Sequence, residues 1–156
     1  MYDKLIEHIK LILTVYLNTR EFFKVIAQSK IFPNNLDLRG ILHFINENTI
    51  IRLAAALEVN GVKTEWKNPK GMIPNYNYKD AASIGTIFLF RNSIMHNGGK
   101  LKFKKNVLNK KYYEEFCVNH PEAKKNEGET LCLAIDSVIL PLIKGCLDFI
   151  NKIVIP

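Results

Sequence analysis

The sequence predicts an all-α protein built as an antiparallel four-helix bundle. Apolar residues recur at spacings of three, four or seven through several long segments, whereas the alternation typical of strands is nearly absent. None of these helices can bury its apolar face alone, so they are expected to pack on one another. The 156 residues are 47% apolar and 24% charged, a composition that predicts one globular domain over residues 1–156 and argues against disorder.

The first two helices are predicted from their apolar faces and their stop signals. We expect the first over Tyr2–Gln28, with a kink near Asn18. A connection that contains a proline and several turn formers follows, and the second helix is expected over Asp37–Glu58. Asn60 and Gly61 mark its end, because glycine readily adopts the left-handed conformation that closes a helix.

The third helix follows a long stretch without helical periodicity, residues 62–78, which contains two prolines and a glycine and predicts a loop. Asp80 is well placed to cap this helix, since its carboxylate can accept the free amide hydrogens of the first turn. The helix is expected to run through His96 and to end at Gly98 and Gly99.

A long basic loop is expected between the third and fourth helices, continuing to about Glu129. The fourth helix is expected over Thr130–Ile153, with Pro141 kinking it. The formal net charge of +7 is concentrated in the loop, where residues 100–111 hold lysines and no acid. Such a cluster attracts polyanions, although a solvated loop is the ordinary alternative for a lysine run. Its members are Lys100, Lys102, Lys104, Lys105, Lys110 and Lys111.

Several classes of protein are excluded on composition. The N-terminus lacks the apolar run of a secretory signal, and the longest apolar stretch, residues 131–143, is far shorter than the ~20 residues of a membrane span. Three widely spaced cysteines suit a reducing compartment, so we expect a cytoplasmic protein without membrane association. Cys117 and His120 have the spacing of half a zinc site, but no second pair follows, so neither a metal nor another cofactor is expected.

The candidate functional residues lie at the end of the third helix, in the segment Arg91-Asn-Ser-Ile-Met-His96. Arg91 falls within an apolar stripe, where a permanently charged guanidinium needs an anion, carbonyl groups or a wet interface. His96 lies in the last turn, where the helix dipole favours its cationic form and leaves it able to exchange a proton near neutral pH. The two residues are five positions apart, about 140° around the helix, so a groove shared with a partner helix is needed to bring them together.

This segment resembles the motif of the HEPN superfamily, in which an arginine is followed after four to six residues by a histidine. The polar residue that often follows the arginine is supplied here by Asn92. The resemblance implies a four-helix bundle with the motif late in the third helix. It also implies a homodimeric, metal-independent ribonuclease that acts as a toxin or in antiviral defence, with an antitoxin or another defence-system protein as a partner.

The resemblance gives each residue a role. Arg91, Asn92 and His96 are the catalytic candidates, and the candidate RNA contacts are Lys100, Lys102, Lys104 and Lys105. Members encoded beside a nucleotidyltransferase antitoxin commonly carry a tyrosine two residues after the histidine. This chain has Gly98 there, so regulation through that tyrosine is not expected.

Two acids of the second helix, Glu47 and Glu58, are candidates for orienting Arg91 if the second and third helices pack together. His43 and Glu47 share a helix face at a spacing of four, which is more often a surface contact than a catalytic pair. The alternative function, from a different class, is a catalytically silent helical module that binds a protein or a nucleic acid.

Overall fold

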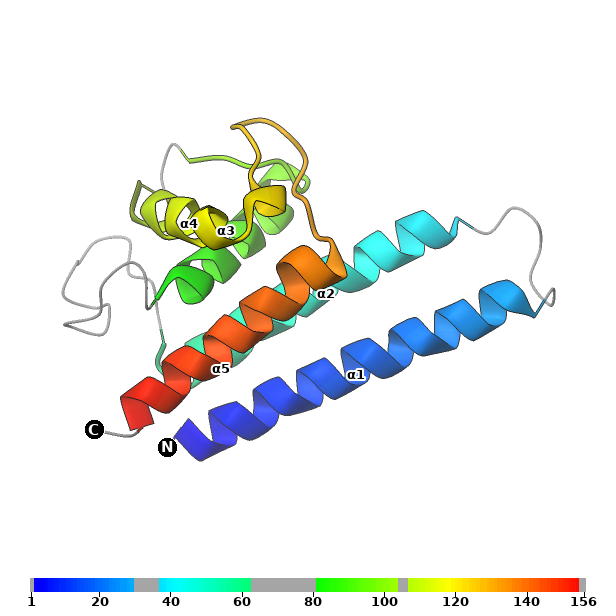
Figure 1. Ribbon diagram of the computed structural model, residues 1–156, viewed down its shortest axis with the longest axis horizontal. Coiled ribbons are helices and arrows are strands. Elements are labelled where there is room, and N and C mark those ends of the chain that lie inside the picture. The colour runs from blue at the N-terminus through cyan, green and yellow to red at the C-terminus, as the bar shows by residue number, and fades with distance from the viewer. Residues whose placement is uncertain (1, 30–36, 63–80, 104–106, 155–156) are drawn as a thin grey trace.

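The structure is a computed structural model that describes residues 2–29, 37–62, 81–103 and 107–154. These residues form five α-helices and no strand, with one isolated bridge between Lys100 and Thr130, so the predicted all-α class is confirmed. A 3-10 turn follows α4 and a π-helical turn precedes α5 (Figure 1). The elements are α1 (Tyr2–Gln28), α2 (Leu38–Val59), α3 (Ala82–Asn97), α4 (Val107–Asn119), the 3-10 turn Pro121–Ala123, the π turn Ile135–Ile139 and α5 (Leu140–Val154).

All five helices contribute buried side chains to one hydrophobic core. Helix α1 packs on α2 and α5, and α3 packs on the same two helices from the other side (Figure 1). The core is formed by fully buried aliphatic side chains, such as Leu5 and Ile9 of α1, Ile50 and Leu53 of α2, and Leu142 of α5. Every residue from 81 to 90 is buried, which makes the first half of α3 the most enclosed segment of the chain that the structure describes.

Glycines allow the closest of these helix contacts. A Cβ atom at Gly85 of α3 would lie 2.3 Å from the ring of Tyr112 in α4, and one at Gly145 of α5 would lie 2.0 Å from the hydroxyl of Ser83. A side chain at either position would force the helices apart, which explains why small residues occur in otherwise apolar segments.

The expectation of a long loop up to Glu129 is wrong, because α4 lies within this segment and packs more extensively on α3 than any other helix does. Its buried face consists of Tyr112, Tyr113, Phe116 and Cys117, a spacing of one, three and one that suits a helix buried on one side. The lysines beside these residues mask the apolar pattern in the sequence.

The start of the last helix also differs from the prediction. Residues from Thr130 onward do not begin a helix; a π turn at Ile135–Ile139 leads into α5, which begins at Leu140. Pro141 is the second residue of α5 and the seventh of the continuous helical segment that begins with the π turn. The Leu140 amide just before it donates to the Ile135 carbonyl, so the proline lies inside a hydrogen-bonded segment from which it removes one donor.

The other predicted boundaries agree with the structure where it describes them. Asp37 caps α2 by accepting a hydrogen bond from the Gly40 amide at 2.9 Å, and α2 ends one residue before Asn60. Gly98 closes α3 in the left-handed conformation, with φ of +57°. Helix α1 is continuous through Asn18, where a kink was expected. The proposed cap Asp80 and nearly all of the predicted 62–78 loop lie outside the described residues.

A buried polar network joins α1, α2 and the segment before α5. The Tyr16 hydroxyl donates to the side-chain oxygen of Asn46 at 2.9 Å and accepts from Arg20 at 3.1 Å. The Asn46 amide in turn donates to the Leu133 carbonyl at 2.8 Å. Among the described residues, no helix is both long enough and apolar enough to cross a membrane.

Candidate functional site

The candidate site begins where α3 leaves the core. Arg91 is the first residue of the helix that is not fully buried, with 27% of its side chain exposed. One guanidinium nitrogen donates to the side-chain oxygen of Asn92 at 2.8 Å, and the other terminal nitrogen forms an ion pair with Glu58 near the end of α2. Of the partners expected for Arg91, namely an anion, carbonyl groups or a wet interface, the structure supplies an anion, the carboxylate of Glu58.

These contacts orient Arg91 without consuming its hydrogen-bonding capacity. A guanidinium carries five N–H groups, and it makes no hydrogen bond to the described residues beyond the two to Asn92 and Glu58. Because 39% of the Glu58 side chain is exposed, solvent weakens this ion pair, which contributes at most about 1 kcal/mol to folding. The remaining donors can meet a second anion, such as a phosphate.

His96 lies in the last turn of α3, exposed to solvent. It makes no hydrogen bond or ion pair with another residue in the parts of the chain that the structure describes. The neighbouring Met95 is 57% exposed, and Ile94 is partly buried against the core. The helix end therefore presents an imidazole beside an uncovered apolar side chain.

The two acids proposed to orient Arg91 lie in different places. Glu58 contacts Arg91, whereas Glu47 lies 3.3 Å from the imidazole nitrogen of His43. A Cβ atom at Gly99 would lie 3.1 Å from a Glu47 carboxylate oxygen, so Glu47 borders the end of α3. Glu47 and Glu58 are three helical turns apart on one face of α2. This face of α2 therefore lies along the second half of α3.

The predicted basic residues continue from this helix end. Lys100 and Lys102 are exposed, while Lys104 and Lys105 lie outside the described residues. Residues 99–103 run beside residues 127–131: the Leu101 amide donates to the Glu129 carbonyl at 2.9 Å, and the Leu131 amide donates to the Gly99 carbonyl at 2.9 Å. This pairing fixes the path of the chain that carries Lys100 and Lys102.

Sequence reasoning missed two basic residues, Lys124 and Lys125. They line a cleft with Phe103 and with Lys110, which was predicted as part of the lysine cluster but belongs to a helix, α4, where a loop was expected. The sequence signal that could have revealed α4 was the spacing of Lys110 and Glu114, four residues apart, which is typical of a surface helix.

The cysteines and metal-ligating residues do not form a second site among the described residues. Burial raises the pKa of the Cys117 and Cys146 thiols, so both stay protonated and unreactive at neutral pH. His120 packs its ring against Phe116, with 4.5 Å between the ring centroids. The described residues contain no group of three or more side chains able to hold a metal ion.

Comparison of the chain with protein-family models, with curated proteins and with solved structures identifies no match.

Proposed function

We propose that the protein is a metal-independent endoribonuclease of the HEPN type, acting as a toxin or as an antiviral defence effector. The observation that carries this proposal is the end of α3, where Arg91 is held by Glu58 and Asn92 while His96 is left exposed. The sequence resemblance supplies the class of reaction. The exposed lysines that follow give the surface the charge that RNA requires.

In the proposed reaction, neutral His96 accepts the proton of a ribose 2′-hydroxyl. The 2′-oxygen attacks the adjacent phosphorus, the bond from phosphorus to the 5′-oxygen breaks, and a proton from the imidazolium completes the leaving hydroxyl. Arg91 stabilises the charge that grows on the phosphate oxygens. The products are a 2′,3′-cyclic phosphate and a 5′-hydroxyl, and the mechanism requires no metal because the nucleophile belongs to the RNA.

Asn92 acts through Arg91 in this scheme. Its side chain is buried, and its oxygen accepts a hydrogen bond from the guanidinium. A buried acceptor of this kind restricts the rotamers of the arginine, so Asn92 and Glu58 are positioning residues rather than groups that touch the RNA. Glu47 is separated from Arg91 and is left with His43 as its contact.

The site is proposed to be completed by a second copy of the chain. Arg91 and His96 face different sectors of α3, and Met95 between them is exposed, so a symmetric contact there covers apolar surface and closes a groove. The proposed partners are a second copy of the chain, RNA, and an antitoxin or other defence-system protein. The proposed location is the cytoplasm. A Met95→Glu variant should be monomeric in sedimentation experiments if this contact forms.

The alternative is a catalytically silent module that binds a protein or a nucleic acid. The contact between Glu58 and Arg91 supports this alternative, because a carboxylate already pairs with part of the guanidinium. The two functions differ in a direct assay. RNA is incubated with the protein and a chelator, and the ends of the fragments are identified.

The proposed function requires fragments with cyclic phosphate and 5′-hydroxyl ends, and their loss in the His96→Ala variant. Cleavage that stops with chelator, leaves a 5′-phosphate or persists without His96 would refute it. A lack of cleavage for every RNA, combined with retained binding, would support the silent module.

A further inference from the structure

A second candidate site lies away from the catalytic residues, in a cleft of about 550 Å³ between α4 and residues 124–127. Its lining has an apolar part, with Phe103, Tyr113 and Cys117, and a charged part in which Lys110, Lys124 and Lys125 outnumber two acids, Glu114 and Glu127. A concave aromatic surface beside several cations suits a ligand with a planar group and negative charges.

Phe103 is held at the edge of this cleft by contacts on several sides. Its backbone amide donates to the Glu127 carboxylate at 3.2 Å, and its ring lies 6.0 Å from that of Tyr113, centroid to centroid. The Lys110 ammonium lies over the Phe103 ring, 5.3 Å from its centroid. The ring is therefore fixed in direction but only partly buried.

Tyr113 fixes the segment that carries two of the lysines. Its hydroxyl donates to the Ala123 carbonyl at 2.9 Å and accepts from the Lys125 amide at 2.6 Å. Burial raises the pKa of Tyr113, so the hydroxyl remains protonated and keeps both bonds across the physiological range. The backbone at Lys124 and Lys125 is thus placed by a buried tyrosine, while the Lys124 side chain is exposed.

The lysines of the cleft are available to an incoming anion. Lys110 contacts Glu114 at 3.7 Å and the Phe103 ring. Both are exposed contacts, which contribute little to folding stability. The Glu127 carboxylate accepts from the Phe103 amide. A base that stacks on Phe103 takes the place of the Lys110 ammonium, which can then turn to a phosphate.

A short stretch of backbone connects the end of α3 to the edge of the cleft. Residues 99–103 lead from Gly99 to Phe103, held beside residues 127–131 by backbone hydrogen bonds. Four residues of extended chain span at most about 14 Å, a distance that a few nucleotides of a single strand can cover. Lys100 and Lys102 lie along this path, so positive charge is present between the two sites.

We propose that this cleft binds single-stranded RNA on one side of the cleaved bond, with a base stacked on Phe103 and phosphates paired with Lys110, Lys124 and Lys125. The inference rests on the proposed ribonuclease function in naming the ligand as the substrate strand. An acidic peptide would meet the same lysines but offers no planar group for the Phe103 ring. Duplex RNA keeps its bases stacked inside the helix and therefore should bind less tightly.

The test measures binding separately from cleavage. Fluorescence anisotropy of a short labelled single-stranded RNA is recorded over a range of salt concentrations, in the His96→Ala background and with chelator. Phe103→Ala should weaken binding roughly 5- to 100-fold through loss of stacking. Phe103→Leu keeps an apolar side chain without an aromatic face and should show a similar loss, which separates stacking from folding.

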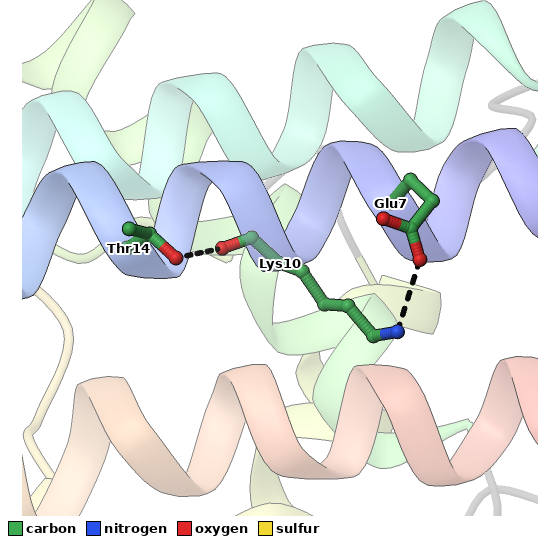
Figure 2. Close-up of polar contacts among 3 residues, drawn as sticks. All are labelled: Glu7, Lys10 and Thr14. Carbon is green, nitrogen blue, oxygen red and sulfur yellow. Dashed lines mark hydrogen bonds and ion pairs between the residues drawn. The ribbon is translucent and has the colours of Figure 1, made fainter.

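Removal of two lysines tests the electrostatic part. Lys124→Ala combined with Lys125→Ala should reduce the slope of log affinity against log salt by about 1.4, since each phosphate contact on a single strand contributes about 0.7. The matched control is Lys4→Ala with Lys10→Ala on α1, which makes the same change in net charge. Lys10 there pairs with Glu7 at 3.0 Å, and its carbonyl accepts from Thr14 (Figure 2).

The outcomes separate this site from the catalytic proposal. Three results would overturn the cleft as an RNA site. The α1 control could lose as much affinity as the cleft variant, or neither Phe103 variant could affect binding. Polyglutamate could also bind with the same dependence on Phe103. If the unmodified protein cleaves RNA and the cleft variants bind RNA normally, the cleft proposal is wrong and the ribonuclease proposal stands. Cleft-dependent binding without any cleavage supports the cleft and overturns the ribonuclease assignment.

Discussion

Two arginines are withdrawn from solvent in this protein, and their surroundings differ. Arg20, between α1 and α2, is only 9% exposed and donates to the neutral hydroxyl of Tyr16, with its guanidinium also 5.6 Å from that ring. Arg91, between α2 and α3, is more exposed and meets a carboxylate and an amide oxygen. The first arginine belongs to an enclosed network that ends on the backbone of the chain, whereas the second lies at an open helix end.

The difference indicates what each arginine does. The Arg20 network is closed on itself through Asn46 and the Leu133 carbonyl, so its loss leaves buried polar groups without partners and lowers stability. The Arg91 pair is weakened by solvent, and its loss has little effect on folding. We therefore expect Arg91 to matter for activity and the Arg20 network to matter for stability.

The largest expected effect is on the rate of cleavage in Arg91→Ala. Loss of a donor that stabilises developing negative charge costs about 10² to 10³ in rate, while the free energy of unfolding should change by less than about 1 kcal/mol. RNA cleavage and urea unfolding are measured on the same preparation. Arg39→Ala, an exposed arginine at the start of α2, is the matched control and should leave both quantities unchanged. A large loss of stability in Arg91→Ala with activity per folded molecule retained would reverse the roles given to the two arginines.

The next effect is on stability, in Asn46→Ala. This change removes the acceptor of the Tyr16 hydroxyl proton and the donor to the Leu133 carbonyl, and it should lower the free energy of unfolding by about 1 to 3 kcal/mol. Cleavage measured well below the melting temperature should remain normal. Asn48→Ala, on the same helix but partly exposed, should have a much smaller effect on unfolding. Equal destabilisation by the two variants would mean that the network is not a stabilising unit.

A smaller effect is expected for Glu58→Gln, which keeps the shape of the side chain and removes its charge. If Glu58 positions Arg91, the cleavage rate should fall roughly two- to fivefold, the range that corresponds to an exposed ion pair, with RNA affinity unchanged. Measuring kcat and KM separately is informative, because a purely structural role of Glu58 would change neither constant. A rise in RNA affinity would show instead that Glu58 competes with phosphate for Arg91.

The smallest effect concerns alkaline pH. Burial raises the pKa of Tyr16 above its ordinary value of 10.0, although the neighbouring Arg20 opposes this shift. Its contribution to stability is therefore present below pH 10.0 and is lost as the pH rises through the higher value in the folded protein. Melting curves should show a shallower alkaline decline for Tyr16→Phe than for the unmodified protein. Identical slopes would place the alkaline transition elsewhere, for example at the buried Tyr113.

The sequence predicted the Arg91 environment because one physical rule applied: a permanent charge inside an apolar stripe requires a partner. The same rule points to Arg20, which lies one turn after Tyr16 on the buried face of α1, but its partner Asn46 is distant in sequence. No local pattern identifies Asn46, since its role depends on the packing of α1 against α2 and on the backbone near Leu133.

Helix α4 shows another limit of local patterns. Its buried residues are interleaved with Lys110, Lys111 and two glutamates, so charge dominates any short window of the sequence. The positions of the residues that we propose to bind RNA were therefore only partly predicted. Lys100 and Lys102 follow directly from the lysine run, whereas Lys124 and Lys125 reach the cleft through the Tyr113 hydrogen bonds, which connect segments that the sequence does not associate.

The central claim is that the RNA itself supplies the nucleophile at a site formed by Arg91 and His96. Once a cleaved bond has been mapped, an RNA is synthesised with a single 2′-deoxyribose on the 5′ side of that bond and is compared with the unmodified RNA. We predict that cleavage at this bond is abolished, while other cleaved bonds in the same molecule and the affinity for the RNA are unchanged. Normal cleavage at the deoxy position would contradict the mechanism, because a water molecule would then have to be the nucleophile.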